Sequence, residues 1–419
     1  MVAPAHMNVK DAASRLLAAL PEGDAAGRTR FAELGFPSPR DEDWRFTPVK
    51  PITELNFSAA SADDDATLEG CVFAAIDGPQ LVFVNGHYSE ALSQVGELPA
   101  GVEVRPMSAG DCPTPPAPED AFGALNAATV TDGPFISVAE NVHFEPPVRV
   151  YYLSTGSNGA TANLRGYIRA EVNSRVTVLE SWTGTQASYF NNASTELHAA
   201  DNAQVEHVKF QDEHTGAFHV GGLHTTLGRD ARVAHHSLAL GGRIARNNLR
   251  AHLNGTGIEA VLNGLYLPRA GQLIDHHMVV NHKQPHCDSH EYFNGILDDD
   301  SRAVFHGRIH VHKGADKTDA KQTNKNLLLS DSATIDTKPQ LEIYADDVKC
   351  THGATIGQMN AEQIFYLRAR GLDEESARRM IMHAFAGEIV ERIQFETARQ
   401  ELDRLVWNRL EQMGGLVAA

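Results

Sequence analysis

Two potential metal ligands, Cys350 and His352, lie two residues apart in the stretch LEIYADDVKCTHGATIG. On an extended strand such residues point to the same side with Cα atoms about 6.5 Å apart, so both can reach one metal or cluster. A structural zinc or a metal–sulfur cluster usually takes four protein ligands, and this stretch offers no third cysteine. If the pair is a site, the missing ligands come from Cys287 across the strands or from another chain. The alternative is two ordinary residues at the end of a strand.

The chain is also rich in histidine, with 21 residues, of which 15 fall between His207 and His312. Neutral imidazole is the commonest metal ligand in proteins. Polar side chains also form ladders on repetitive β-folds, so metal binding and structural packing both stay open. Three short groups combine potential ligands: His276, His277 and His282; His286, Cys287 and His290; His306, His310 and His312.

Composition and missing motifs exclude several classes of function. The net charge of −18 argues against non-specific binding of nucleic acid or anionic membranes. The sequence has no G-x-x-x-x-G-K-[ST] phosphate loop and no dinucleotide-binding G-x-G-x-x-G, so we expect that it binds no nucleotide directly. It has no signal-peptide pattern and no apolar window of about 18 residues, so we expect a cytoplasmic protein without membrane contact. Four scattered cysteines predict no disulfide framework.

A repeat between residues 131 and 357 predicts the element that must position these side chains. Alternating apolar runs follow polar turns, and their spacings are 29, 28, 25, 46 and 31 residues, where we interpret 46 as two steps of 23. A strand–turn unit of this length predicts a mainly β fold, a parallel β-helix. A β-sandwich is the structural alternative, because its strands also recur at short spacing. The first strand residues of the runs are Val176, Val205, Val233, Ile258, Val304 and Ile335.

Residues 1–110 precede the repeat and are expected to form a helical and mixed region. Asn8 and Asp24 are suitable helix caps, and Asn85 followed by glycine predicts a hairpin turn. Trp44 lies in an extended piece, RDEDWRFTPVKP, and is interpreted as an aromatic anchor to the body of the protein. A contact with a partner is the alternative interpretation of Trp44.

Two further regions complete the predicted organisation. Residues 111–130 are expected to form a proline-rich linker and a short helix, and residues 358–419 a C-terminal helical domain. Asn360 and Asp373 are suitable caps for the first two C-terminal helices.

The helix after Asp373 carries a broad apolar stripe. The stripe either packs against the β-helix or forms an adaptable surface that docks a partner, for which methionine and phenylalanine are well suited. Both interpretations hold if one face packs while the other binds. The candidate docking residues are Met380, Ile381, Phe385 and Ile389.

Three stretches of the chain resemble a known family. His282–Gly357 closely resembles the SufB/SufD family of iron–sulfur cluster assembly proteins. EDWRFTP (Glu42–Pro48) and VFVNG (Val82–Gly86) resemble the N-terminal half of the D members. The resemblance covers most of the chain and implies an N-terminal helical region, a right-handed parallel β-helix and a C-terminal helical domain.

The resemblance also implies roles for single residues. It places His352 as the residue that a D member contributes to a nascent cluster, with Cys350 beside it. Gly353 stands where a B member is expected to have glutamate, and this favours a D member, as does the small number of cysteines. Within the matched stretches we assign structural roles to Trp44, Asp347 and Gly353.

The resemblance implies that the protein is an assembly scaffold rather than an enzyme. One B member, one D member and two copies of the ATPase SufC form the complex, and the C-terminal helical domains each dock one SufC. ATP binding by SufC then strains the interface at which B and D share a transient iron–sulfur cluster. An unpaired edge of the β-helix would allow the isolated chain to form a homodimer, and the sequence leaves its oligomeric state open.

Three other functions compete with this interpretation. The first is a β-helix metalloenzyme with a histidine-ligated zinc site. The second is a B-type scaffold that holds a cluster by itself. The third is a purely structural D subunit, in which His352 is a packed residue and only the docking of SufC matters.

Overall fold

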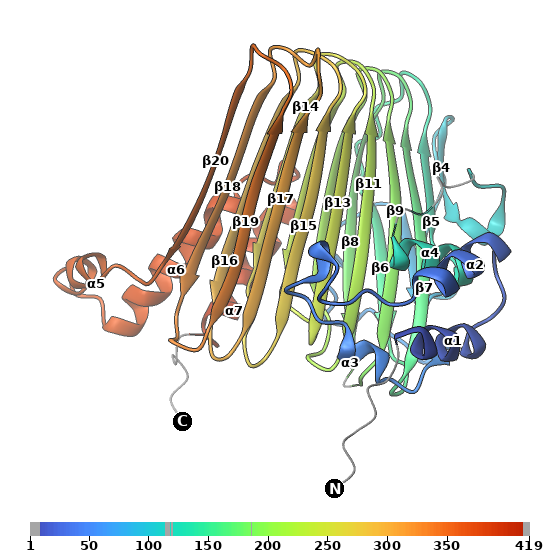
Figure 1. The fold of residues 1–419 in the computed structure, drawn as a ribbon, viewed down its shortest axis with the longest axis horizontal. Helices are drawn as coiled ribbons and strands as arrows, with labels where there is room; N and C mark the ends of the chain where they lie inside the picture. Colours follow the sequence, from blue (N-terminus) through green and yellow to red (C-terminus); the bar gives the residue numbers. More distant parts are fainter. Residues whose placement is uncertain (1–8, 114–117, 119, 186, 414–419) are drawn as a thin grey trace, which may run out of the picture.

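The computed structural model describes residues 9–113, 118, 120–185 and 187–413. Two ten-stranded sheets form the body of the fold (Figure 1). Sheet A contains β4 (Val102–Pro106), β5 (Pro134–Val138), β7 (Ala160–Ala170), β9 (Phe190–Ala199), β11 (Phe218–Leu227), β13 (Ile244–Leu253), β15 (Leu273–His282), β17 (Arg302–Val311) and β19 (Thr334–Ile343), with β1 (Ser58–Ala59) paired to β7. Sheet B contains β3 (His87–Tyr88), β2 (Gln80–Val84), β6 (Val148–Ser154), β8 (Arg175–Gly184), β10 (Gln204–Asp212), β12 (Arg232–Ala239), β14 (Glu259–Tyr266), β16 (Asp288–Leu297), β18 (Asp319–Leu328) and β20 (Lys349–Gly357).

Strands that follow one another in the chain alternate between the two sheets. From β5 onward, each strand pairs in parallel with the strand two places later, so that Val205 of β10 lies opposite Val233 of β12. The result is a parallel β-solenoid of about eight turns with helices at both ends of the chain. The predicted fold class, a mainly β parallel β-helix flanked by helical regions, is confirmed. The β-sandwich alternative is wrong, because sandwich sheets are antiparallel.

The interpretation of the 46-residue spacing is wrong. Ile258 directly precedes β14 of sheet B, whereas Val304 belongs to β17 of sheet A. The spacing therefore covers one full turn plus the passage from one sheet to the other, not two short turns. Both strands of a turn show the same alternation of apolar and polar residues, because each strand has one face toward the interior. The alternation therefore does not reveal to which sheet a strand belongs.

The apolar core has three parts. The largest lies between the two sheets and contains residues such as Val178, Leu249 and Phe305. A second core lies between the outer face of sheet A and the helices α1 (Val9–Ala19), α2 (Ala25–Leu34) and α4 (Ala121–Thr129). A third lies between the outer face of sheet B and the C-terminal helices. The sheets are thus covered by helices on both outer faces (Figure 1).

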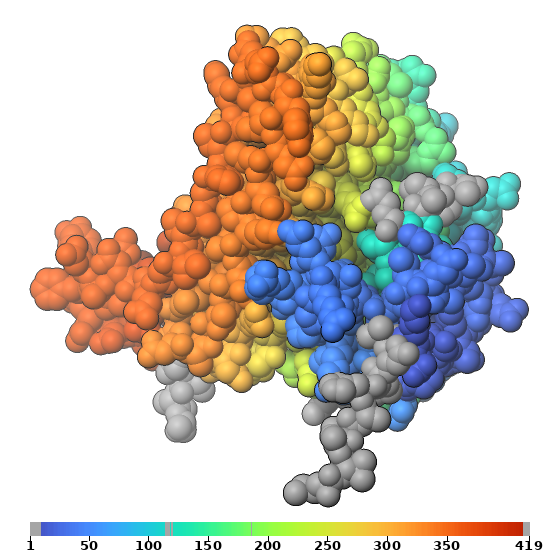
Figure 2. All heavy atoms as spheres, viewed as in Figure 1, coloured from blue at the N-terminus to red at the C-terminus, as the bar shows by residue number. Residues whose placement is uncertain are grey.

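The N-terminal segment is attached to sheet A by Trp44, which lies in the short helix η1 (Glu42–Trp44) and is buried. The guanidinium of Arg246 lies 3.8 Å from the Trp44 ring and donates to the Asp43 carbonyl at 2.6 Å. The interpretation of Trp44 as an anchor agrees with this burial. Figure 2 shows this segment, in blue, lying against strands coloured yellow and orange.

Local predictions for residues 1–130 hold in part. Asp24 caps α2 by accepting from the Gly27 amide, and Asn85 makes the turn between β2 and β3, as predicted. Asn8 and the prolines at 115 and 116 lie outside the described residues. The sheets extend further toward the N-terminus than residue 131, because β2 pairs with β6 and β4 pairs with β5. A short helix α3 (Lys50–Thr53) lies between η1 and β1, and a short 3-10 helix, η2 (Met107–Ala109), follows β4.

The C-terminal region forms α5 (Ala361–Arg368), α6 (Glu374–Val390) and α7 (Glu396–Leu410). Asn360 and Asp373 cap α5 and α6 as predicted, by accepting from the amides of Glu362 and Ser376. None of the described helices is both long and apolar enough to span a lipid bilayer.

Candidate functional site

The last strand of sheet B, β20, lies at the open end of the β-helix (Figure 1). It pairs with β18 along one edge, and within the described chain no other strand pairs with its second edge. A free edge presents unpaired N–H and C=O groups, which readily accept a strand from another chain. Nearly all residues of β20 are exposed. This end of the solenoid therefore has the properties of an interface.

Cys350 and His352 both lie on β20 and point to the same side, as the sequence predicted. In the register they lie opposite Ala320 and Gln322, two buried residues of β18 that face the interior between the sheets. Cys350 is half-buried against an apolar cluster that includes Ile309 and Ala320, and this burial raises the pKa of its thiol. His352 is exposed. Cys350 and His352 thus extend the stacked, interior-facing side chains of sheet B to its exposed last strand.

Cys287, one predicted source of further ligands, is not close enough to this pair. Cys287 directly precedes β16, and β18 lies between β16 and β20. Two strand spacings of about 4.8 Å each therefore separate Cys287 from β20, the strand of Cys350. Its thiol is buried and donates to the Gly255 carbonyl at 3.2 Å. Among the described residues, the only group of three potential ligands within reach of one metal does not include Cys350 or His352. If the pair binds a metal, its other ligands lie outside the described residues, and a second chain is one such source.

Behind His352, the interior row contains a buried carboxyl group that the sequence analysis missed. Gln322 lies opposite both His352 and Glu291 in the register, and its amide donates to Glu291 Oε2 at 2.6 Å. Burial raises the pKa of Glu291 to about 8. The available signal was alternation, because Ser289, Glu291 and Phe293 occupy every second position of β16 and all three are buried.

Large apolar side chains are exposed around this open end. Tyr344 is 62% exposed, and Ile343 and Ile356 are also largely exposed. A Cβ atom added to Gly353 would meet no atom within 4 Å, so the surface there has room for a partner. Asp347 pairs with Lys317 at the preceding corner of the solenoid, which fits a structural role. Adjacent exposed apolar side chains such as Ile343 and Tyr344 are typical of protein–protein contact sites, and Ile356 lies separately, near the far end of β20.

A second exposed apolar surface is a groove of about 620 Å³ between α5 and α6. Met380, Ile381 and Phe385, three of the predicted docking residues, line it together with Tyr366 and Leu367. The prediction for Ile389 is wrong, because Ile389 is only 1% exposed and packs in the core against sheet B. Phe365, next to the groove on α5, is 73% exposed.

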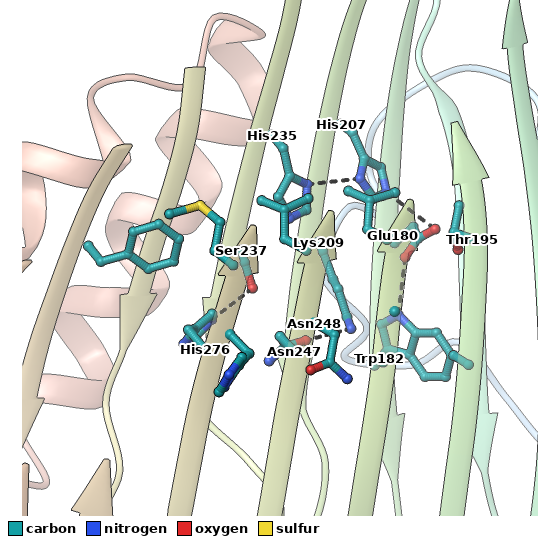
Figure 3. Close-up of a pocket in the computed structure, with 18 residues that line it drawn as sticks. Glu180, Trp182, Thr195, His207, Lys209, His235, Ser237, Asn247, Asn248 and His276 are labelled. Atoms are coloured by element: carbon teal, nitrogen blue, oxygen red, sulfur yellow. Dashed lines mark hydrogen bonds and ion pairs between the residues drawn. The ribbon is translucent and has the colours of Figure 1, made fainter. Parts of the chain in front are cut away.

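A buried polar network inside the β-helix was also missed by sequence analysis (Figure 3). Glu180 lies 3.2 Å from His207, whose Nδ1 lies 3.0 Å from Nδ1 of His235. The Lys209 ammonium donates to Asn247 at 2.8 Å, and burial lowers the pKa of Lys209 to about 8. The cavity among these groups measures about 30 Å³, which holds about one water molecule. The cavity is therefore too small for an organic substrate.

Comparison with known proteins agrees with this architecture. A family model described as "SUF system FeS cluster assembly, SufBD core domain" matches residues 152–385, and one described as "SufBD protein N-terminal region" matches residues 6–150. The iron-sulfur cluster assembly protein SufD of Escherichia coli is 33% identical over 91% of each chain. The SufBD family protein slr0076 of Synechocystis is 31% identical over 90% of this chain and 88% of its own length. The chain therefore belongs to the SufB/SufD family of iron–sulfur cluster assembly proteins.

Proposed function

We propose that this chain is a non-ATPase scaffold subunit of a Suf-type assembly complex, in which it pairs with a SufB-like paralogue. The observation that carries the proposal is the incomplete pair at the free edge: His352 is exposed and Cys350 half-buried on β20, with no third ligand from the described part of the chain. Both residues then contribute to a nascent iron–sulfur cluster whose other ligands belong to the paralogue. The exposed Tyr344 and Ile356 become buried in the same interface.

The protonation state of the Cys350 thiol supports a site shared with a second chain. Burial raises the pKa of its thiol, so in the isolated chain the group is a neutral thiol and a poor ligand. Iron bound by the partner's ligands lowers the pKa of this thiol and releases its proton. His352, in contrast, is exposed, and a histidine binds metals through a ring nitrogen. The isolated chain is thus expected to hold no stable cluster.

We further propose that the groove between α5 and α6 docks the ATPase SufC. Met380, Ile381 and Phe385 offer an apolar surface, and the Glu362 carboxylate at its border suits a partner with basic groups, whereas Glu388 is already paired with Lys325. The chain itself binds no nucleotide in this proposal. ATP hydrolysis takes place in SufC, which needs two copies in the complex.

A direct covalent link connects the groove to the cluster site. Strand β20 ends at Gly357, and α5 begins at Ala361, only four residues later. On its other side the groove is formed by α6, which is held on sheet B where Asn294 donates to the Phe385 carbonyl at 2.8 Å. A movement of α5 relative to α6, caused by SufC closure, therefore reaches β20 without crossing the rest of the molecule.

The test is co-expression with a SufB-like paralogue and SufC, anaerobic purification and measurement of iron and sulfide. We expect a complex of three kinds of subunit, with His352→Ala reducing the cluster content and leaving the subunit composition unchanged. His198→Ala is the matched control, because His198 is exposed on β9, far from the open end. Equal cluster content in His352→Ala and His198→Ala would contradict the proposal and indicate a purely structural subunit. A cluster bound by the chain alone would indicate a B-type scaffold instead.

The groove is tested separately with Met380→Glu. This change places a charge in the apolar surface, and we expect it to remove SufC from the complex while the SufB-like paralogue stays bound. Arg378→Glu, on the same helix but outside the lining of the groove, is the control. Retention of SufC by Met380→Glu would contradict the proposed docking site.

A further inference from the structure

Three potential metal ligands meet on the outer face of sheet A, under the N-terminal segment. His277 of β15 and His306 of β17 lie opposite each other in the register, and Asp43 of η1 lies over both. One ligand atom from each residue lies within 4.8 Å of the other two. Nε2 of His277 is 3.4 Å from Asp43 Oδ1, and Nδ1 of His306 is 4.0 Å from the same oxygen.

These separations fit a common metal ion. Two ligands that each lie about 2.1 Å from a tetrahedral zinc are about 3.4 Å apart. The distance from His277 to Asp43 matches this value, and the distance from His306 exceeds it by an amount that a small rotation of the Asp43 side chain removes. Asp43 can make this movement because its side chain is 51% exposed.

The neighbours of the two imidazoles orient the correct nitrogen atoms toward Asp43. Nε2 of His306 lies 2.6 Å from the Gln340 side-chain oxygen and donates its proton there, which leaves Nδ1 with a free lone pair. Nδ1 of His277 faces the Asp275 carboxylate at 3.6 Å, beyond hydrogen-bond distance, and Nε2 faces Asp43. The His306–Gln340 hydrogen bond, from the distal nitrogen to a carbonyl oxygen, is of the kind that usually supports metal-binding histidines.

The His277 imidazole is buried without a hydrogen-bond partner among the described residues. His277 is 9% exposed, and no described residue makes a hydrogen bond of good geometry with either of its ring nitrogens. Buried polar atoms without a partner are rare in folded proteins and call for a ligand or water.

The site has access to solvent through a hollow of about 250 Å³ beside Asp43 and His277, which provides a path for a metal and room for a water ligand. Three arginines line this hollow, and each has an acidic partner: Arg246 pairs with Asp275, Arg250 with Asp120 and Arg308 with Glu342. Glu42, next to Asp43, adds a further carboxylate near the entrance, paired with Lys338.

We propose that Asp43, His277 and His306 bind one divalent first-row transition metal, Zn²⁺ or Fe²⁺, with water completing the coordination. Two imidazoles and one carboxylate are a donor set typical of both metals. The site is independent of the proposed cluster site, since it lies on β15, β17 and η1 rather than on β20. Because Asp43 belongs to the N-terminal segment, the metal fastens this segment to the β-helix.

The experiment is anaerobic titration of the full chain with Co²⁺, whose visible absorption reports its coordination. We expect one equivalent to bind with high affinity and without a thiolate-to-metal band. Asp43→Asn and His306→Ala are expected to weaken binding at least tenfold. Asp43→Asn carries the test if His306→Ala does not fold, because Asp43 is exposed. Competition with Zn²⁺ and with Fe²⁺ then identifies the preferred metal.

Matched controls separate this site from the others. His310→Ala removes a histidine from the same strand, β17, that lies outside the three-residue group, and we expect unchanged Co²⁺ binding. His352→Ala is expected to leave Co²⁺ binding unchanged as well, whatever its effect on cluster assembly. Tight binding that survives Asp43→Asn and His306→Ala, loss of binding in His352→Ala, or failure of both Zn²⁺ and Fe²⁺ to displace Co²⁺ would overturn the proposal.

Discussion

Glu291 gives the most quantitative prediction from this structure. Its carboxyl group is fully buried on β16, where it accepts from Gln322 at 2.6 Å and lies 3.4 Å from the Ser289 hydroxyl. Burial raises its pKa from the ordinary value of 4.5 to about 8. The folded protein therefore keeps this carboxyl protonated at neutral pH, whereas the unfolded chain releases the proton. We predict that Glu291→Gln, which has the same shape and no proton to lose, stabilises the protein at pH 7.

The sign and the magnitude follow from proton linkage. Between pH 4.5 and pH 8 the folded state binds one proton more than the unfolded state at Glu291, so stability falls as the pH rises. Each pH unit in this range lowers the free energy of unfolding by about 1.4 kcal/mol. At pH 7 the loss reaches about 3 kcal/mol relative to pH 4.5. Glu291→Gln removes this loss, and the Gln322 amide can turn to accept from the new side chain.

The assay is urea denaturation at pH 5, 6, 7 and 8, combined with hydrogen exchange of β16 and β18, because a solenoid of this length can unfold in parts. The gap between Glu291→Gln and the parent should widen from pH 5 to pH 8. Glu259→Gln is the control, since Glu259 is exposed on β14 and lies 3.7 Å from Arg232, a surface pair worth less than about 1 kcal/mol. Parallel pH profiles for Glu291→Gln and the parent would refute the assignment of a buried, protonated carboxyl group.

Three further changes test the attachment of the N- and C-terminal regions and the open end. Glu206→Ala removes the carboxylate that accepts from the Gln394 and Phe395 amides at the start of α7; a loss of about 2 kcal/mol should speed amide exchange in α7 about 30-fold, and unchanged exchange would contradict the contact. Trp44→Ala removes a buried anchor worth about 3 kcal/mol, so limited proteolysis should cut the N-terminal segment first; cleavage that begins in the β-helix would argue otherwise. Ile356→Asp alters an exposed residue, so the melting temperature should stay constant while sedimentation shows at least tenfold weaker pairing with the SufB-like paralogue, and unaltered pairing would move the interface elsewhere.

The C-terminal helices show where sequence reasoning reaches its limit. Helix α6 was correctly located from its cap and its periodicity, yet one of the four predicted docking residues faces the core. The helix carries two adjacent apolar faces: Met382, Ala386 and Ile389 pack on sheet B, while Met380 and Ile381 line the groove. Both faces satisfy the same helical period, so only the position of sheet B decides which one is covered.

The polar interior shows a second limit. Glu291 and Lys209 lie at strand positions that the alternation assigns to the interior. By their residue types, however, both would be expected on the surface. Their burial follows from stacking, because each side chain has a neighbour of the same orientation in the turns above and below. A charged residue at an interior position is costly unless it is paired or changes its protonation, so a single sequence gives no reason to expect one there.

The alternation of side chains along the strands and the length of one turn can be read from the linear order of the residues. Those features follow from local backbone geometry, and they suffice to predict a β-helix with Cys350 and His352 on one side of a strand. The tertiary structure alone decided which end of the solenoid is open, and it brought Asp43 to His277 and His306. These arrangements depend on where separate elements pack, and packing joins residues more than 200 positions apart whose local sequences carry no sign of each other.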